Sequence, residues 1–254
     1  MELYSRKRGA GDAVILLHGL FGSMDNLGVL MRGLEDSYTV IGVDLRNHGR
    51  SRHALPHDTD TMAADVFEVM NREGINSAYI YGHSMGGKVA MQMALMAPSR
   101  VKGLIIGDIA PVLYPRHHSA ILEGMQALAK EDIESREAAT SFMRNYEDTP
   151  AVLSFLLTNL RRDDDGKLGW RLGLDNIAAD YDLFMQGLDG GSYTGPVLFL
   201  KGGDSDYIKS EHREKILSLF PAATVKIIEG AGHWFHAEKP ELTVRLVKDF
   251  LEKL

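Results

Sequence analysis

A serine held between two glycines is the residue of this sequence best placed to do chemistry. Residues 82–86 read Gly-His-Ser-Met-Gly, the pattern in which a serine stands exposed on a sharp turn between a strand and a helix. The two glycines remove side chains that would crowd this turn. The apolar residues 78–81 predict the strand, and residues 88–97 predict the helix. We therefore expect Ser84 to be a nucleophile rather than a helix cap.

A serine hydroxyl is a weak nucleophile and needs a base within hydrogen-bond reach. His233 is the predicted base, because it lies in the glycine-rich segment 230–236 after the last predicted strand. This position agrees with the chain order of serine, acid and histidine that is typical of the motif. His236 is expected to pack locally, and His83 is expected to shape the substrate pocket beside the serine.

The acid that orients the histidine has two candidate positions. Asp108 follows the strand predicted directly after the serine turn, whereas Asp204 and Asp206 follow the next strand along the chain. Both positions satisfy the order in which the acid comes between the serine and the histidine. The residues by themselves leave this choice open.

The negative charge that develops on the reacting oxygen needs two N–H donors aimed at one point. The backbone N–H of Met85 is the first, because it opens the predicted helix and has no partner within it. The second is expected from the loop at residues 18–22, directly after a buried strand. Within that loop we favour Leu20, and Phe21 is the alternative.

The elements that position these residues alternate between strand and helix over most of the chain. This alternation predicts a mainly parallel sheet with helices on both faces. Residues 2–8 predict an additional edge strand. In such a sheet ligands bind beyond the carboxyl ends of the strands, where all the candidate catalytic residues fall. The buried strands are predicted at residues 13–17, 38–43, 78–81, 101–106, 196–200 and 224–228.

The alternation stops between residues 112 and 192, which contain no strongly apolar strand. Helices are predicted there at residues 118–128, 133–146, 151–160 and 176–188. Asp163, Asp164 and Asp165 precede a glycine, which predicts an exposed turn or short hairpin rather than a metal-binding loop. We therefore expect a core domain made of residues 1–111 and 193–254, with residues 112–192 inserted as a helical cap.

Composition narrows the possible partners and cofactors. The chain has 254 residues, 44% of them hydrophobic, a net charge of −7 and no cysteine. The absence of cysteine excludes disulfides, thiolate metal sites and a cysteine nucleophile. The lysines and arginines are scattered, and no apolar run is long enough to span a membrane. We expect a cytoplasmic protein that binds neither nucleic acid nor membranes and needs no metal or organic cofactor. The oligomeric state is left open.

Six motifs in order carry a resemblance to a known family. The sequence resembles the α/β-hydrolase superfamily along nearly its whole length. More closely, it is similar to the small bacterial YbfF-type carboxylesterases and their mitochondrial relatives. The motifs are HGLFGS at residues 18–23, DNLG at 25–28, DLRNHGRS at 44–51, GHSMGGK at 82–88, DIAP at 108–111 and GHWFHAEKP at 232–240.

The resemblance implies a sheet of about seven strands with an inserted helical cap. It also favours Asp108 over the alternative acid Asp206, because members of this subgroup carry the acid in the DIAP motif. Only residues 1–12 precede the first buried strand, so the antiparallel hairpin that opens the superfamily sheet is expected to be shortened.

The implied function is that of a serine carboxylesterase acting through an acyl-enzyme on small-molecule esters of short- to medium-chain acids, or on thioesters. Phe21, His83 and Trp234 are expected to contact the substrate. Apolar cap residues either line the acyl pocket or form the interior of the cap. They are Met125, Leu128, Phe142, Met143, Phe155, Leu156, Phe184 and Met185.

Other functions use the same catalytic residues and remain alternatives. They are an aminopeptidase-type enzyme, a carbon–carbon bond hydrolase and a lyase, which differ from an esterase in the substrate that the cap admits. A non-catalytic binding protein with this fold is a further alternative. It is disfavoured because every candidate member of the triad is present.

Overall fold

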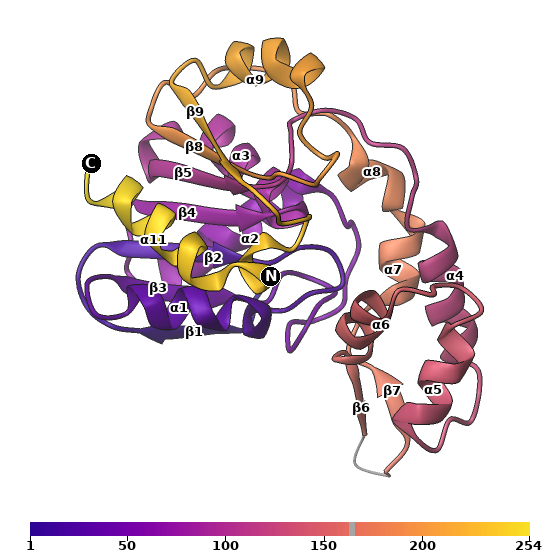
Figure 1. Ribbon diagram of the computed structural model, residues 1–254. Helices are drawn as coiled ribbons and strands as arrows, with labels where there is room; N and C mark the ends of the chain where they lie inside the picture. Colours follow the sequence, from indigo (N-terminus) through magenta and orange to yellow (C-terminus); the bar gives the residue numbers. More distant parts are fainter. Residues whose placement is uncertain (163–165) are drawn as a thin grey trace.

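A mixed sheet runs through the centre of the computed structural model, which describes residues 1–162 and 166–254 (Figure 1). Within these residues, seven strands form this sheet in the order β1-β3-β2-β4-β5-β8-β9. The strands are β1 (Ser5–Arg8), β2 (Ala13–Leu17), β3 (Thr39–Val43), β4 (Ala78–His83), β5 (Val101–Gly107), β8 (Val197–Gly202) and β9 (Ala223–Ile228). All neighbours are parallel except β1, which pairs antiparallel with β3 at the edge.

The sheet separates two apolar layers, which confirms the predicted α/β class. Strand β2 is buried along its whole length because alternate side chains enter opposite layers. One layer packs against α2 (Thr59–Arg72), α3 (Met85–Met96) and α9 (Arg213–Leu219), and the other against α1 (Gly28–Leu34) and α11 (Pro240–Leu251). The predicted edge strand is present as β1. The sheet opens with this single strand in place of a hairpin.

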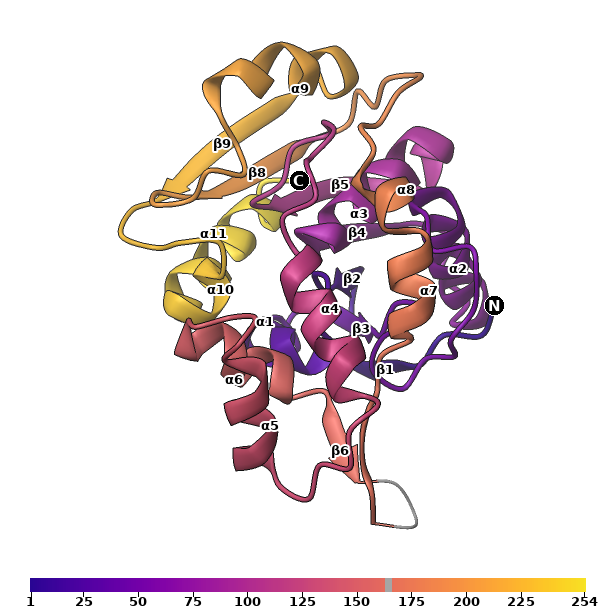
Figure 2. The same cartoon turned by 90° about the vertical axis from the view of Figure 1, so that its right-hand side faces the viewer.

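The chain between β5 and β8 adds no strand to this sheet and forms a separate lobe beside it (Figures 1 and 2). We propose that residues 112–192 form a cap domain inserted into a core domain of residues 1–111 and 193–254. The lobe contains α4 (Ser119–Leu128), α5 (Arg136–Met143), α6 (Pro150–Leu157), β6 (Leu160–Arg162), β7 (Leu168–Trp170), α7 (Leu174–Ala179) and α8 (Tyr181–Met185). Strands β6 and β7 pair as the predicted short hairpin. Asp163, Asp164 and Asp165 lie outside the described residues.

Two predicted elements differ from the structure. The helix predicted at residues 176–188 is two short helices, α7 and α8, that meet at Asp180. The segment at residues 230–236, predicted as a loop, runs into the short helix α10 (Phe235–Glu238). Short 3₁₀ turns occur at Met24–Leu27, Pro98–Arg100 and Ser210–His212. The sequence did not predict the break between α7 and α8 at residue 180, because the helical spacing of apolar residues continues across it.

A buried lysine joins the two lobes. Lys88, in α3, is 2% exposed, and its Nζ donates to the backbone carbonyls of Phe184, Met185 and Gln186 at 3.4, 2.8 and 2.7 Å. The last carbonyls of a helix have no partner within it, so the ammonium group satisfies the end of α8. Burial lowers the pKa of Lys88 to about 7. The residue therefore anchors α8 to the helix that begins at Ser84.

Replacing Lys88 by Met should destabilise the protein, because the carbonyls of Phe184 and Gln186 lose their donor and that of Met185 keeps only the Tyr114 N–H. Hydrogen bonds to a charged group stabilise more than neutral ones, so we expect the free energy of unfolding to fall by about 3 kcal/mol. Urea unfolding of Lys88→Met measures this loss. The exposed Lys130 offers a matched control, and Lys130→Met should leave the unfolding free energy unchanged. Equal stabilities for the two variants would contradict the anchoring role.

Buried histidines predict that acid destabilises the fold. His57 is fully buried, its Nε2 has no partner among the described residues, and burial lowers its pKa to about 4. Burial likewise lowers the pKa of His236 to about 4 and that of His118 to about 3. The unfolded chain takes up protons on these groups below about pH 6.5, whereas the folded chain does not. Each of these three histidines therefore lowers the free energy of unfolding by about 1.4 kcal/mol for every pH unit below about pH 6.5.

The variant His57→Gln should lessen this acid sensitivity. We expect it to reduce the difference in unfolding free energy between about pH 7.5 and about pH 5.5 by about 1 kcal/mol. Denaturant unfolding at both pH values measures the difference. His53→Gln changes an exposed histidine and should leave the difference as in the parent chain. An unaltered difference in His57→Gln would show that His57 is not held neutral.

Candidate active site

The turn between β4 and α3 holds Ser84 in a conformation that side-chain-bearing residues rarely adopt. Its backbone angles are φ 53° and ψ −119°. A Cβ atom at Gly82 would collide with the carbonyl of Gly86, and one at Gly86 would lie 2.5 Å from the carbonyl oxygen of Leu17. Glycine is therefore required on both sides of the serine, as the sequence pattern predicted. The turn lifts the serine above the carboxyl ends of the strands.

Asp108 and His233 are brought together at the same edge of the sheet. Asp108 follows β5 and is fully buried, and its Oδ2 accepts a hydrogen bond from His233 Nδ1 at 2.8 Å. The backbone N–H of Gly202 donates to Oδ1 at 3.1 Å, and the hydroxyl of Ser205 donates to Oδ2. Because Nδ1 of His233 is occupied by this carboxylate, Nε2 is the ring nitrogen available to the pocket.

The structure does not bring the alternative acid Asp206 to the histidine. Asp204 and Asp206 are exposed, and within the described residues neither carboxylate has a hydrogen-bond or ion-pair partner. The residue between them, Ser205, is the one that faces Asp108. Sequence reasoning missed Ser205 because a carboxylate is the usual partner of a histidine. Its place just after β8, next to β5 in the sheet, was the available signal.

Two further residues fix the position of His233. The ring of Tyr207 stacks on the His233 ring with centroids 4.0 Å apart and an angle of 19° between planes. Nε2 of His83 lies 2.8 Å from the His233 carbonyl oxygen. Burial lowers the pKa of His83 well below its ordinary value, so His83 is neutral and donates its Nε2–H to that carbonyl. His83 thus positions the histidine loop and lines the pocket beside the serine.

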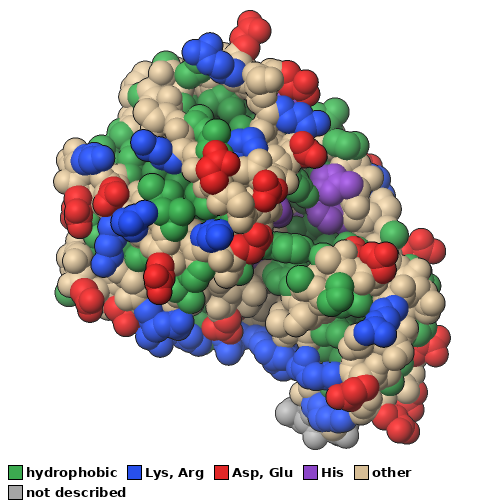
Figure 3. All heavy atoms as spheres, in the orientation of Figure 1, with side chains coloured by type: hydrophobic (Ala, Val, Ile, Leu, Met, Phe, Trp, Pro, Cys, Tyr) green, Lys and Arg blue, Asp and Glu red, His purple; other side chains and the backbone are tan. Residues whose placement is uncertain are grey.

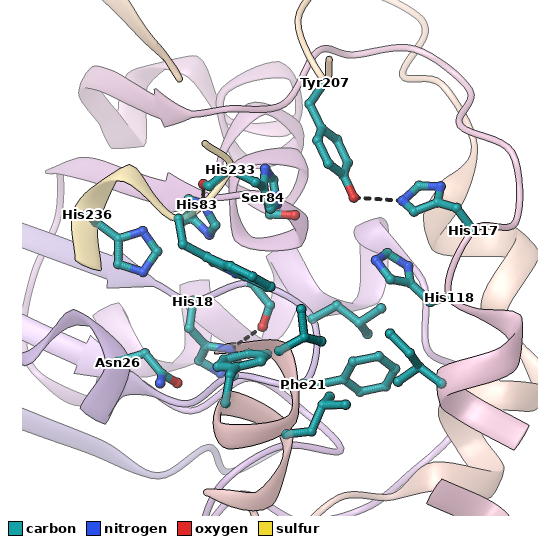
Figure 4. A pocket seen from close by; sticks show the side chains of 18 of the residues that line it. His18, Phe21, Asn26, His83, Ser84, His117, His118, Tyr207, His233 and His236 are labelled. Atoms are coloured by element: carbon teal, nitrogen blue, oxygen red, sulfur yellow. Dashed lines mark hydrogen bonds between the residues drawn. The ribbon is translucent and has the colours of Figure 1, made fainter. Parts of the chain in front are cut away.

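Ser84 and His233 line the same cavity (Figure 4). Although both residues are described, no hydrogen bond joins the Ser84 hydroxyl to His233 in this structure. Catalytic hydrogen bonds of this kind are often long without substrate and tighten when substrate binds. Rotation of the serine side chain about its Cα–Cβ bond changes where the hydroxyl points without any change in the backbone.

The backbone amides of Leu20 and Met85, the donors favoured from the sequence, have no acceptor within the described part of the chain. The Phe21 amide is not free, because it donates to His48 Nε2 at 3.1 Å. Of the two residues considered for the second donor, Leu20 is therefore the available one. The first loop also packs closely on the serine turn, since a Cβ at Gly19 would lie 3.2 Å from Ser84 Cβ.

A cavity of about 280 Å³ opens at Ser84 between the two lobes. Figure 3 shows the hollow between them, with histidine side chains at its rim. Phe21, His83 and Trp234, the expected substrate contacts, all line it. From the inserted segment, Phe155 and Leu156 line it too, and the Phe155 ring lies 5.6 Å from that of Trp234.

The other apolar residues considered for the acyl pocket divide into two groups. Phe184 and Met185 line a second, smaller cavity of about 20 Å³ that Ser84 also lines. Four residues line neither of these cavities: Met125, Leu128, Phe142 and Met143. Three of the four are buried, and Phe142 packs against the same apolar cluster. These four residues form the interior of the inserted segment, which is the second of the two interpretations.

Among residues 1–162 and 166–254, no group of three or more His, Asp or Glu side chains is arranged to hold a metal ion. None of the helices in the described ranges is both long enough and apolar enough to cross a membrane.

Comparison with known proteins places this architecture in a family. A family model described as alpha/beta hydrolase fold matches residues 12–240. A putative esterase/lipase of Haemophilus influenzae is 38% identical over 94% of this chain and 83% of its own length. Esterase YbfF of Escherichia coli is 37% identical over 94% of this chain and 92% of its own.

Among solved structures, one described as a marine microorganism esterase superposes with a TM-score of 0.95. It is 36% identical, and the match covers 98% of this chain and 99% of the other. These findings confirm the predicted fold class and the predicted resemblance to YbfF-type esterases. The chain belongs to the α/β-hydrolase family.

Proposed function

We propose that this α/β-hydrolase is a serine carboxylesterase in which Ser84, His233 and Asp108 carry the reaction. The buried hydrogen bond between Asp108 and His233, at the cavity that Ser84 also lines, is the observation that carries the proposal. The esterase names of its relatives support ester substrates over the amide or carbon–carbon bonds that the same residues can cleave.

The reaction begins when Ser84 Oγ attacks the ester carbonyl carbon while His233 Nε2 takes its proton. Asp108 holds the imidazole in the tautomer with a proton on Nδ1 and stabilises the imidazolium that forms. The N–H groups of Leu20 and Met85 donate to the oxyanion. His233 then protonates the leaving alcohol, and an acyl-Ser84 ester remains. Water, deprotonated by His233, hydrolyses that ester and restores the serine.

Asp108 can act in this way only if its charge is tolerated away from water. A buried carboxylate is costly unless donors surround it. The N–H of Gly202 and the hydroxyl of Ser205 supply two donors besides His233. We assign Ser205 a positioning role, because it contacts the acid rather than the substrate.

The cavity indicates a small, largely apolar ester. Phe21, Phe155, Leu156 and Trp234 supply an apolar lining around the polar groups of the serine turn. Such a lining holds an apolar substituent, while the few polar groups orient the carbonyl. Residues of the proposed cap close the side of the cavity that faces away from the sheet.

A fluorophosphonate probe should label the wild-type protein on Ser84. The probe reacts only with a serine whose base and oxyanion donors are in place. Ser84→Ala should abolish the label while the circular dichroism spectrum is unchanged. A folded wild-type protein that does not react with the probe would contradict the proposed catalysis.

The two candidate acids can be separated by matched variants. Asp108→Asn should lower kcat by a factor on the order of 10⁴, the effect of the same change in a well-studied serine protease, because the histidine loses its correct tautomer. Asp206→Asn removes an exposed carboxylate and should leave kcat unchanged. Both are measured with p-nitrophenyl acetate. Near-normal turnover in Asp108→Asn, with a collapse in Asp206→Asn, would reverse the assignment.

A further inference from the structure

The loop that carries the Leu20 N–H is a tight turn. The Gly22 N–H donates to the Gly19 carbonyl oxygen at 3.0 Å, so Leu20 and Phe21 are the two central residues. Phe21 has a φ of 58°, whereas Leu20 does not have a positive φ. Positive φ at the third residue alone is typical of a type II turn, in which that position is usually glycine. A phenylalanine there is strained, and the surrounding structure must hold it in place.

The strain at Phe21 bears on the neighbouring donor. The N–H of the second residue makes no bond within a turn of this kind, so the Leu20 N–H is free to meet a ligand. Relaxation of Phe21 to a negative φ would turn over the Leu20–Phe21 peptide unit and free the segment that carries the Leu20 N–H. A donor to an oxyanion is effective only when it is fixed before the reaction begins.

The core domain holds the N–H side of Phe21. This N–H donates to His48 Nε2 at 3.1 Å, and the bond is buried. His48 Nδ1 lies 2.8 Å from the Arg46 carbonyl oxygen, which can only accept, so Nδ1 carries the proton and Nε2 is left to accept. Burial also lowers the pKa of His48 well below its ordinary value, which keeps the ring neutral.

The inserted segment holds the carbonyl side of Phe21, which lines the cavity (Figure 4). Asn159 Nδ2 donates to the Phe21 carbonyl oxygen at 2.7 Å and to the Leu156 carbonyl oxygen at 3.1 Å. Because both partners are carbonyl oxygens, the nitrogen of the amide must face them. Asn159 is 5% exposed, so removal of its amide would take the donor from a buried carbonyl, which is costly.

The backbone of Asn159 is itself fixed within the inserted segment. Asn159 follows α6, and its N–H donates to the Leu156 carbonyl oxygen at 3.1 Å. Its carbonyl oxygen accepts from the Arg171 N–H at 2.9 Å, next to the pairing of β6 with β7. The inserted segment therefore meets the Leu20 loop with a residue that is held on both sides.

We propose that Asn159 is a positioning residue for the oxyanion hole, which keeps Phe21 in the strained turn from which the Leu20 N–H reaches the reacting oxygen. His48 holds the same residue from the core domain, so Phe21 is clamped between the two lobes. The inserted segment then takes part in catalysis as well as lining the cavity. This inference rests on the proposed esterase function and adds to it a residue outside the triad and the oxyanion donors.

The variant Asn159→Leu removes the donor and keeps a branched side chain of similar length. With p-nitrophenyl acetate we expect kcat to fall by a factor on the order of 10 to 10², because a misplaced oxyanion donor weakens the transition state. KM should stay within about twofold of the parent value, because binding of the ester itself is unaltered. Kinetics of folded Asn159→Leu equal to those of the parent would overturn the proposal.

Asn145→Leu is the matched control. Asn145 is exposed, and its Nδ2 donates at 3.0 Å to the Phe142 carbonyl, three residues earlier, as Asn159 does to Leu156. Among the described residues its side chain makes no hydrogen bond to the core domain. Asn145→Leu should leave kcat and KM unchanged. A loss of kcat equal to that of Asn159→Leu would show that the bond to Phe21 is not the cause.

A pair of ketone inhibitors separates positioning from a general structural effect. Ser84 Oγ adds to the carbonyl carbon of a phenethyl trifluoromethyl ketone, its proton passes to His233, and the ketone oxygen becomes an oxyanion. The matching methyl ketone binds without this addition. Asn159→Leu should weaken inhibition by the trifluoromethyl ketone by the same factor as kcat and leave inhibition by the methyl ketone unchanged. Equal weakening of both would overturn the positioning role.

Circular dichroism shows whether Asn159→Leu is folded. If it is not, Asn159→Ser replaces it with the same expected changes, because serine is smaller and too short to reach Phe21. Wild-type protein that neither hydrolyses p-nitrophenyl acetate nor reacts with a fluorophosphonate probe overturns the esterase function itself. Active wild-type protein whose folded Asn159 variants match it overturns only the role of Asn159.

Discussion

Asp108 is a carboxylate with no access to water, and its hydrogen bond to His233 can exist only where other donors share the charge. Gly202 and Ser205 supply those donors from the strand beside β5 and from the loop that follows it. The candidate site therefore depends on the pairing of β5 with β8, as the sheet itself does. The same sheet edge brings up the Ser84 turn from β4 and the Leu20 loop from β2. Parallel strands make this possible because their carboxyl ends all meet at one edge.

Three residues of the candidate site are held with positive φ: Phe21 at 58°, Ser84 at 53° and Asp108 at 48°. Conformations of this kind cost of order 1–3 kcal/mol each and persist only where the surrounding structure imposes them. Here the fully buried strands β2 and β4 impose them, together with the glycines that flank Ser84. The apolar layers on the two faces of the sheet therefore offset the strain stored in the site. The inserted segment adds a second constraint, since Lys88 joins the helix that starts at the serine to the end of α8.

Much of this arrangement was predictable because its signals are local. The serine turn, the donor loop and the histidine loop each occupy a few consecutive residues, and alternating apolar runs fixed the order of strands and helices. What escaped prediction depends on contacts between distant residues. Ser205, which follows β8, donates to Asp108, which follows β5. Lys88 donates to the end of α8, nearly a hundred residues further along the chain. Apolar periodicity also could not show that Phe155 and Leu156 face the cavity while Met125 and Met143 face the interior. Both kinds of residue occupy apolar faces of helices, and only packing tells them apart.

The central claim is that Ser84 carries the acyl group in a covalent intermediate. Rapid acid quench of the protein during turnover of p-nitrophenyl acetate, followed by mass spectrometry of its peptides, tests this claim most directly. We expect a mass gain of one acetyl group on the peptide that contains Ser84, formed at least as fast as steady-state turnover. Turnover without any acetylated peptide, or with the acetyl group on a different residue, would contradict it.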